Sequence, residues 1–497
     1  MNNDVRIIDT TFRDGSQSLW ASGMRTGMIE AVAEDMGQAG FAAVEVPANA
    51  IYFKKLVRDL KEDPWEMCRM VARKMPNTVK GCMAGGIIHP FEAPPPRAIV
   101  KLFFERVTAT GALNRAQMTA NTFGQIENAF PWIIPVFRNL GMQIILALSY
   151  SLSPRHTDEY YAHKTREVLK FKPDALYIKD QSGLLTPDRV RTLVPAILEN
   201  AGGVPVELHS HCTTGLADVV YMEALKLGIR TLHTAAPPLA NGSSQPSIFS
   251  VTRNARHLGY NPVVNEEIVR RASDRLVAIA RQEKLPIGAP LEYDYAQYIH
   301  QLPGGVISNL KHQLAELRLQ HRLDEVLEDT VQLRRELGYP IMITPHSQFM
   351  ATQAAINVAL GERWKVVIDE LILFAFGTFG EDSGYTWMDP NLKDRLLSTP
   401  RAKELAHRKV APDVSLKEIR ESLGGPGVSD EELLLRYIMK GEQEIAAMRA
   451  AGPYKQYVSA TAPLHTLLKE LSKHPKVRYI HVQRGDDSLV VRKQSAK

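Results

Sequence analysis

Short apolar runs alternate with longer amphipathic stretches over the first half of the chain. Eight of these runs have the length and composition of strands, at residues 5–9, 43–46, 78–83, 116–118, 143–148, 175–178, 204–208 and 231–233. Each is followed by a stretch with helical periodicity, for example residues 28–39, 52–75 and 216–227. This alternation predicts an α/β protein with a parallel sheet, and eight such units close into a (β/α)8 TIM barrel. An open, doubly wound sheet is the alternative, but no glycine-rich dinucleotide-binding turn follows the first run.

The pattern becomes mainly helical after Pro262, with helical periodicity over residues 266–282, 310–337 and 352–375. A chain of 497 residues has room for a barrel of about 250 residues and for a second domain. We therefore expect a barrel in residues 1–285 and a helical domain that completes the active site in residues 286–463. The tail, residues 464–497, contains two short apolar runs and is expected to form a small hairpin.

Composition excludes several classes of function. The net charge of +5 is spread along the chain without a basic arm, which argues against a nucleic-acid partner. The start of the chain lacks the pattern of a signal peptide, and no apolar run is long enough to span a membrane. The three cysteines form no Cys-x-x-Cys pair, so a disulfide framework is not expected. These features predict a cytoplasmic globular protein.

His209 and His211 follow the seventh apolar run at i, i+2 spacing, which places both rings on one side of an extended strand. Asp14 follows the first run and Lys179 the sixth. Because the carboxyl ends of barrel strands share one face, these side chains are expected to converge there. One carboxylate and two imidazoles suit a catalytic divalent metal; Zn2+ is favoured, with Mn2+ and Mg2+ as alternatives. The other interpretation is that the two histidines only make hydrogen bonds.

Lys179 ends an apolar run and precedes Asp180. A neighbouring cation and burial would both lower the pKa of its amine. A neutral amine can react with CO2 to form a carbamate, which would be an anionic oxygen ligand for the metal. The alternative is an ion pair between Lys179 and Asp180 or another carboxylate of the barrel.

Six segments resemble motifs of biotin-dependent carboxyltransferase barrels, which are found in pyruvate carboxylase, the α subunit of oxaloacetate decarboxylase and the 5S subunit of transcarboxylase. The segments are residues 9–21, 178–187, 207–215, 242–247, 301–310 and 343–349. They occur in the order typical of the family, and the resemblance extends from about residue 4 to 440.

The resemblance implies a set of four metal ligands, Asp14, carbamylated Lys179, His209 and His211. It implies that Arg13 and Gln17 contact the substrate. Ser308 stands where the family has a threonine that relays a proton between substrate and biotin, and its hydroxyl offers the same donor and acceptor. The implied partners are a small carbon acid, a biotinylated carrier protein and a biotin carboxylase subunit. Such barrels are commonly homo-oligomers.

Two departures from the family pattern refine the expected function. The sequence contains no Ala-Met-Lys-Met-type segment, so we expect biotin on a separate carrier protein. The family's arginine after strand three is also missing, since residues 80–86 read Lys-Gly-Cys-Met-Ala-Gly-Gly. Because lysine does not replace a bidentate arginine clamp, we expect a carboxyl acceptor or donor other than pyruvate or oxaloacetate.

Two alternatives remain open from the sequence. Gly15 stands where the family usually has alanine, and Arg13-Asp14-Gly15 also resembles metal-dependent acyl-CoA lyases and condensing enzymes. A biotin-independent lyase or aldolase-type enzyme on the same barrel is therefore one alternative. A non-catalytic subunit that retains the fold is the other.

Overall fold

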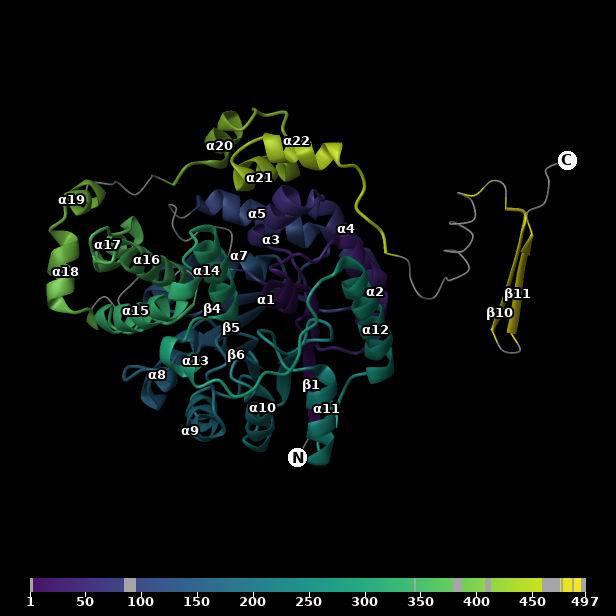
Figure 1. Cartoon of the computed structure of the whole chain (residues 1–497), viewed down its shortest axis with the longest axis horizontal. Helices are drawn as coiled ribbons and strands as arrows, with labels where there is room; N and C mark the ends of the chain where they lie inside the picture. Colours follow the sequence, from purple (N-terminus) through teal and green to yellow (C-terminus); the bar gives the residue numbers. More distant parts are fainter. Residues whose placement is uncertain are drawn as a thin grey trace.

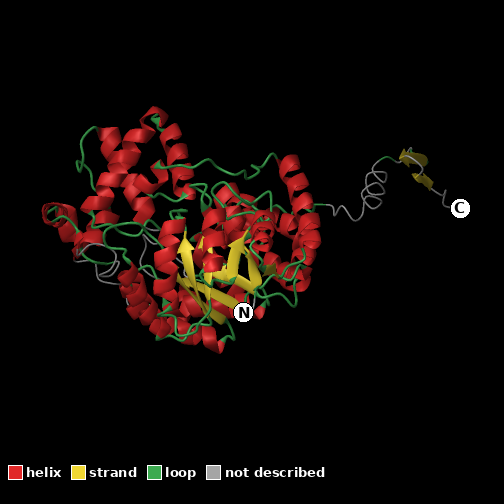
Figure 2. Ribbon diagram, turned by 90° about the horizontal axis from the view of Figure 1, so that it is seen from below, coloured by secondary structure: helices red, strands yellow, loops and turns green. Residues whose placement is uncertain are grey.

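Eight parallel strands close into a barrel surrounded by helices (Figures 1 and 2). This is seen in a computed structural model that describes residues 3–84, 95–343, 346–378, 387–406, 413–457, 474, 477–484 and 487–492. The strands are β1 (Asp4–Asp9), β2 (Ala43–Glu45), β3 (Lys80–Met83), β4 (Arg115–Thr119), β5 (Gln143–Ser149), β6 (Ala175–Asp180), β7 (Val206–Ser210) and β8 (Thr231–Thr234). Neighbours in sequence pair in parallel, and β1 pairs with both β2 and β8. The predicted TIM barrel is confirmed.

Helices follow the strands around the outside of the barrel. They are α1 (Ser16–Trp20), α2 (Thr26–Gln38), α3 (Ala50–Lys55), η2 (Leu56–Leu60), α4 (Pro64–Lys74), α5 (Arg97–Ala109), α6 (Phe123–Asn128), α7 (Phe130–Asn139), α8 (Asp158–Leu169), α9 (Pro187–Leu198), α10 (Ala217–Lys226), α11 (Ile248–His257) and α12 (Glu266–Glu283). A short strand, β9 (Asn261–Pro262), pairs with the start of β1.

The helix predicted over residues 52–75 is wrong as a single element. The chain forms α3, η2 and α4 there, and the break lies at Lys61, which has a left-handed φ of 57°. Proline is favoured in the first turn of a helix and disfavoured inside one. Pro64 therefore begins α4, and Asp63 caps it by accepting a hydrogen bond from the backbone N–H of Trp65.

The helices of the segment predicted as a helical domain contribute to two large hydrophobic cores and to one small cluster. These helices are α13 (Ala296–His300), α14 (Gly304–Glu316), η3 (Gln320–Arg322), α15 (Leu323–Glu336), α16 (His346–Leu360), α17 (Asp369–Ala375), α18 (Pro390–Leu397), α19 (Pro400–Ala406), α20 (Leu416–Ser422), α21 (Asp430–Met439) and α22 (Gln443–Ala450). The small cluster lies between α17 and α19. Leu333, Met350 and Leu396 belong to a core formed by α14 to α18. Leu434 and Ile445 instead belong to the core of the barrel, and Figure 1 shows α20 to α22 lying over α3 to α5.

The tail forms two antiparallel strands, β10 (Tyr479–Arg484) and β11 (Asp487–Arg492), which lie apart from the barrel in both views (Figures 1 and 2). In the part of the chain that the structure describes, no helix is long and apolar enough to cross a membrane.

The carboxyl ends of the strands form the face on which the site is built. The chain leaves β1 through a π-helical turn, η1 (Thr11–Gly15), which is buried throughout. Turns of this kind are frequent at functional sites. Helix α14 begins over the same face, at Gly304, where a Cβ atom would lie 2.7 Å from the Cβ of Ser243. Glycine therefore allows the start of α14 to approach the loop that follows β8.

Candidate metal centre

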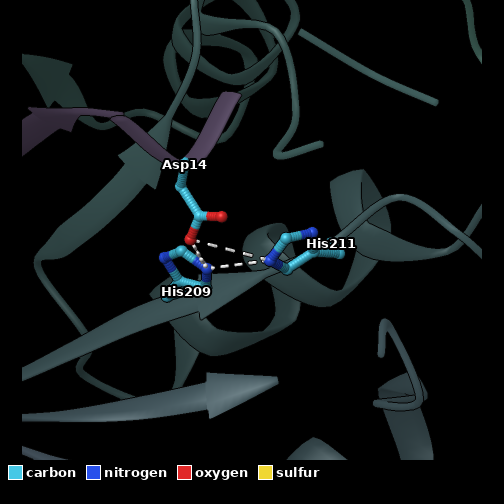
Figure 3. A group of neighbouring side chains, drawn as sticks. All are labelled: Asp14, His209 and His211. Atoms are coloured by element: carbon cyan, nitrogen blue, oxygen red, sulfur yellow. Dashed lines mark hydrogen bonds and ion pairs between the residues drawn. The ribbon is translucent and has the colours of Figure 1, made fainter. Parts of the chain in front are cut away.

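Three potential metal ligands converge at the carboxyl face of the barrel (Figure 3). Asp14 comes from η1, His209 from β7, and His211 from the residue directly after β7. Asp14 Oδ2 lies 3.2 Å from His209 Nε2 and 3.8 Å from His211 Nε2, and the two Nε2 atoms are 3.2 Å apart. All three residues are buried. The sequence prediction that these side chains meet at one face agrees with this geometry.

The arrangement fits a small divalent cation. Zinc binds imidazole nitrogen at about 2.0–2.1 Å, so two ligands at the corners of a tetrahedron are about 3.4 Å apart. The separations of 3.2 to 3.8 Å between the oxygen and nitrogen atoms are close to that value. His211 Nδ1 lies 2.6 Å from the backbone oxygen of Ser243, which can only accept. His211 Nδ1 therefore carries a hydrogen, and His211 Nε2 offers a lone pair to the centre.

The charges around the centre favour the ligand forms of these groups. Burial alone would raise the pKa of Asp14, but the positive charge of Arg13 beside it holds this pKa well below its usual value. Burial lowers the pKa of His209 well below its usual value. Metal ligands must be deprotonated carboxylates and neutral imidazoles. Asp14 and His209 therefore have the protonation states that a metal requires.

Lys179 lies beside this group. Its Nζ is 4.0 Å from Asp14 Oδ2, and Lys179 pairs in register with His209 across β6 and β7. Lys179 is buried, and burial lowers the pKa of its amine. Arg13 lowers this pKa further, whereas Asp14 raises it. The amine is therefore more easily neutral than that of an exposed lysine.

The alternative ion pair between Lys179 and Asp180 is not formed among the described residues. The Asp180 carboxylate instead accepts hydrogen bonds from the backbone N–H groups of Leu184 and Leu185 and from the Ser210 hydroxyl. These bonds fix the turn after β6. The other form of that alternative, an ion pair with another carboxylate of the barrel, is present in this structure, because Lys179 Nζ lies within ion-pair distance of Asp14.

Arg13 is held by two carboxylates. Its Nε donates to Glu45 at 2.7 Å, and its Nη2 lies 3.0 Å from Asp14 Oδ2. Glu45 ends β2 and is buried. Glu45 was not identified from the sequence, although a glutamate between Val44 and Val46 in a short apolar strand is a signal of an inward-facing charge.

Gln17 and Ser308, the two other site residues predicted from the sequence, make none of the contacts described above. Gln17 is on α1 and is exposed, three residues after Asp14. Ser308 lies in the second turn of α14, whose first residue packs against Ser243, but the Ser308 side chain lies outside the described part of the structure.

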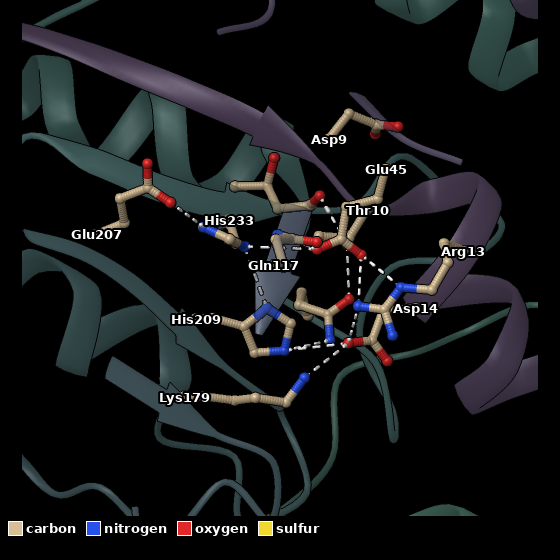
Figure 4. A network of polar contacts seen from close by, with 12 residues as sticks. Asp9, Thr10, Arg13, Asp14, Glu45, Gln117, Lys179, Glu207, His209 and His233 are labelled. Atoms are coloured by element: carbon tan, nitrogen blue, oxygen red, sulfur yellow. Dashed lines mark hydrogen bonds and ion pairs between the residues drawn. The ribbon is translucent and has the colours of Figure 1, made fainter. Parts of the chain in front are cut away.

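A second group of ionisable residues lies deeper inside the barrel than the ligands, and Figure 4 shows His233 and Glu207 on the side of His209 away from Lys179. His209 Nδ1 is 3.2 Å from His233 Nδ1, and His233 Nε2 is 2.9 Å from Glu207. Arg115 forms an ion pair with Glu207 at 2.6 Å. Burial would raise the pKa of Glu207, but Arg115 and His233 lower it to about 2. These residues were not identified from the sequence, although Glu207 and His209 share the i, i+2 spacing of one strand face.

Comparisons with known proteins cover both parts of the chain. Residues 4–275 match the HMGL-like family, and residues 298–490 match the conserved carboxylase domain. A pyruvate carboxylase subunit of Methanocaldococcus jannaschii is 32% identical over 401 residues, which are 79% of this chain and 68% of that protein. The 2-oxoglutarate carboxylase large subunit of Hydrogenobacter thermophilus is 32% identical, over 82% of this chain and 60% of that protein.

A third relative, the methylmalonyl-CoA carboxyltransferase 5S subunit of Propionibacterium freudenreichii subsp. shermanii, is 27% identical over 76% of this chain and 74% of its own. The carboxyl transferase domain of Rhizobium etli pyruvate carboxylase has the same fold. It has a TM-score of 0.78 and 23% identity, and the match covers 99% of this chain and 84% of that one. The six sequence motifs and these matches agree. The chain therefore belongs to the biotin-dependent carboxyltransferase family of enzymes.

Proposed function

We propose that this chain is a carboxyltransferase subunit that moves a carboxyl group between biotin on a carrier protein and a small carbon acid. The observation that carries the proposal is the convergence of Asp14, Lys179, His209 and His211 on one point of the barrel rim. A carboxylate, a lysine and two imidazoles at this place are the ligand set that the family resemblance implies. The family membership supports biotin as the source or destination of the carboxyl group.

Asp14, His209 and His211 would hold the metal, and a carbamate on Lys179 would complete the set. The carbamate forms when the neutral Nζ attacks the carbon of CO2. A nitrogen–carbon bond forms, one carbon–oxygen π bond opens, and Nζ releases a proton to water. Zn2+ is favoured by two imidazole nitrogens beside carboxylate-type oxygens, with Mn2+ and Mg2+ as alternatives. A bound divalent metal would polarise the carbonyl oxygen of the substrate as a Lewis acid.

The chain's own residues would manage charge and protons. Arg13 faces Asp14 and is fixed by Glu45, so its guanidinium can offset negative charge that develops on the substrate. Gln17, on the helix that follows η1, would contact the substrate. Ser308 would pass the proton removed from the substrate carbon to the ring nitrogen of biotin. The nitrogen–carbon bond of carboxybiotin breaks and leaves its electrons on that nitrogen, while the electrons of the broken carbon–hydrogen bond form the new bond to the carboxyl carbon.

We propose a substrate other than pyruvate or oxaloacetate. The family's arginine after strand three is missing from the sequence, and Lys80 does not replace it. The Nζ of Lys80 donates to the backbone oxygens of Met75 and Thr78 at the start of β3, the opposite end of the barrel from Asp14. The relatives are named for pyruvate, 2-oxoglutarate and methylmalonyl-CoA, so the family accepts different acids.

The partners in this proposal are a biotinylated carrier protein and a biotin carboxylase subunit, and the chain itself is proposed to form a homo-oligomer. One relative is named as a single component of a pyruvate carboxylase, which supports an assembly with other polypeptides. The proposed location is the cytoplasm.

Isotope exchange tests the proposal. The purified chain is mixed with a biotinylated carrier protein and a panel of carboxylated acids that carry labelled carbon in the transferable carboxyl group. Label on the carrier that depends on both biotin and the chain supports carboxyl transfer. The His209→Ala variant is the control, and it should give no label. Absence of label with every acid and carrier of the panel would contradict the proposal.

A biotin-independent lyase or aldolase-type enzyme remains the second candidate. The match of residues 4–275 to the HMGL-like family and the presence of Gly15 both favour it. Alanine is excluded at this position without a shift, because its Cβ would lie 2.9 Å from the backbone oxygen of Leu239. In the same assay, cleavage of an acid in the absence of any biotinylated carrier would indicate this second function.

A further inference from the structure

An unbroken chain of polar groups leads from the metal centre into the barrel (Figure 4). His209 Nδ1 lies 3.2 Å from His233 Nδ1, His233 Nε2 lies 2.9 Å from Glu207, and Glu207 lies 2.6 Å from Arg115. The two histidines are fully buried, Glu207 is 3% exposed and Arg115 is 5% exposed. Water therefore has little access to these groups, and each hydrogen bond must be made within the protein.

With His233 neutral, the donors and acceptors of this chain can be assigned in only one order that satisfies every contact. The Glu207 carboxylate is held by Arg115 and can only accept, so His233 Nε2 carries the hydrogen. A neutral imidazole has one N–H, so His233 Nδ1 offers a lone pair. The facing atom, His209 Nδ1, must then donate. As a result, His209 Nε2 carries a lone pair that points towards Asp14 and His211.

The ring of His233 is also fixed in orientation. Tyr177 of β6 stacks on it, with ring centroids 5.3 Å apart and an angle of 12° between the planes. The Tyr177 hydroxyl has no hydrogen-bond partner among the described residues, so its contribution here is the ring.

We infer that His233 is a positioning residue, which together with Glu207 and Arg115 sets the tautomer of His209 that binds the metal. Partners of this kind orient metal-bound histidines, and their loss typically costs about 10–100-fold in metal affinity. The inference rests on the metal centre of the proposed function but needs neither biotin nor carboxyl transfer.

His209 and His233 also permit a competing arrangement, in which a second cation lies between these two rings and the carboxylate of Glu45. Two contacts argue against it. Glu45 Oε1 already accepts from Gln117 Nε2 at 2.8 Å, and Glu45 Oε2 accepts from Arg13 Nε at 2.7 Å. Glu45 is therefore satisfied without a cation. Two ions per chain in the wild-type protein would overturn the inference.

Metal affinity of the full chain tests the inference. The metal-stripped protein is titrated with Zn2+ and Co2+ against a competing chelator, and the visible spectrum of the Co2+ form reports the ligand set. His233→Leu removes the acceptor for His209, and its affinity should fall about 10–100-fold. His233→Asn places an amide oxygen near the former Nδ1 position, so it should recover most of the loss and the wild-type Co2+ spectrum.

The double variant Arg115→Met with Glu207→Leu provides a second test. It removes the acceptor of His233 Nε2 together with the cation that holds this acceptor, so the tautomers of His233 and His209 are no longer fixed and affinity should again fall. Tyr177→Phe is the matched control from the same cluster, because it keeps the stacked ring, and its metal affinity should equal that of the wild type.

Wild-type affinity in folded His233→Leu would overturn the inference. If His233→Leu does not fold, the double variant Arg115→Met with Glu207→Leu decides, and unchanged affinity there would overturn the inference equally. A wild-type chain that binds neither ion also overturns it. A chain that shows the expected affinities but transfers no carboxyl group contradicts only the proposed function.

Discussion

The interior of the barrel contains two layers of ionisable side chains that differ in how they are satisfied. The upper layer, at the carboxyl face, consists of Asp14, Lys179, His209 and His211. The lower layer lies deeper in the barrel, as Glu207 lies two residues before His209 on β7. It consists of Glu45, Arg115, Glu207 and His233. In the lower layer each carboxylate has fixed protein partners: Glu207 has Arg115 and His233, and Glu45 has Arg13 and Gln117.

In the upper layer, acceptor atoms face one another. Asp14 Oδ2, His209 Nε2 and His211 Nε2 lie 3.2 to 3.8 Å apart, and Gln245 Nε2 lies 3.3 and 3.0 Å from the two imidazole nitrogens. Buried polar groups are costly unless they are paired or bind a metal. The carboxylates of the lower layer are therefore satisfied within the chain, whereas the upper layer has the arrangement of a site that could hold a cation. This difference separates the groups that hold the site from the groups that perform chemistry.

The largest expected effect comes from breaking the lower layer. Arg115→Met leaves the buried carboxylate of Glu207 without its cation, so the free energy of unfolding should fall by about 3–5 kcal/mol. Denaturant unfolding of the metal-free chain measures this change. The double variant Arg115→Met with Glu207→Leu removes both charges and should recover a large part of the loss. Equal stability of the single variant and the wild type would show that the layers do not differ as described.

The next effect is loss of a ligand from the upper layer. His209→Ala should weaken Zn2+ binding by about 2.5–4 kcal/mol, or about 100–1,000-fold, since structural zinc sites with four ligands bind with about 10–16 kcal/mol. Metal content after dialysis measures it. His257→Ala, at an exposed position of α11, is the control with the same substitution and should keep the metal. Full metal content in His209→Ala would place the metal elsewhere.

Lys179 tests whether the upper layer is extended by a carbamate. Lys179→Met should weaken metal binding by at least about tenfold and should abolish carboxyl transfer. It should also remove the carbamate resonance that the wild type shows by carbon-13 NMR after equilibration with labelled bicarbonate. Lys226→Met, on the exposed side of α10, should retain that resonance. A wild-type protein without the resonance would exclude the carbamate.

The smallest effect is expected from Tyr177, which lies beside the lower layer, in register with Glu207 and stacked on His233. Its hydroxyl is buried without a partner among the described residues. Because burial of an unpaired hydroxyl costs about 1–3 kcal/mol, Tyr177→Phe should leave stability unchanged or raise it by about 1 kcal/mol. Thermal unfolding of the two proteins provides the comparison. A clear loss of stability would show that the hydroxyl has a partner after all.

The upper layer could be predicted from the sequence, whereas the lower layer was not. The ligands follow apolar runs, and the rule that strand ends share one face brings Asp14, Lys179 and His209 together. The eight predicted strands agree with the observed ones within two residues at each end. Glu207 and Glu45 lie within strands instead. A strand sequence does not show which face points into the barrel when neighbours on both faces are buried.

The breaks in the helices show a second limit. The single helix predicted over residues 52–75 is divided, and Pro64 in the sequence is a local signal for that break. The helix predicted over residues 352–375 is divided after α16, where Gly361 has a φ of 68° and is the corresponding signal. The helix predicted over residues 310–337 is also divided, between α14 and η3, at Arg318 with a φ of 58°. No proline or glycine marks that position, so the break depends on packing between distant segments.

Ser243 connects two parts of the enzyme that are far apart in sequence. Its backbone oxygen fixes the ring of His211, and its Cβ contacts the first residue of α14, the helix that contains Ser308. A displacement of α14 would therefore move the same loop that orients His211, a proposed metal ligand. Substitution of Gly304 by a larger residue should thus disturb the geometry of the proposed metal centre from outside the barrel, through one shared stretch of backbone.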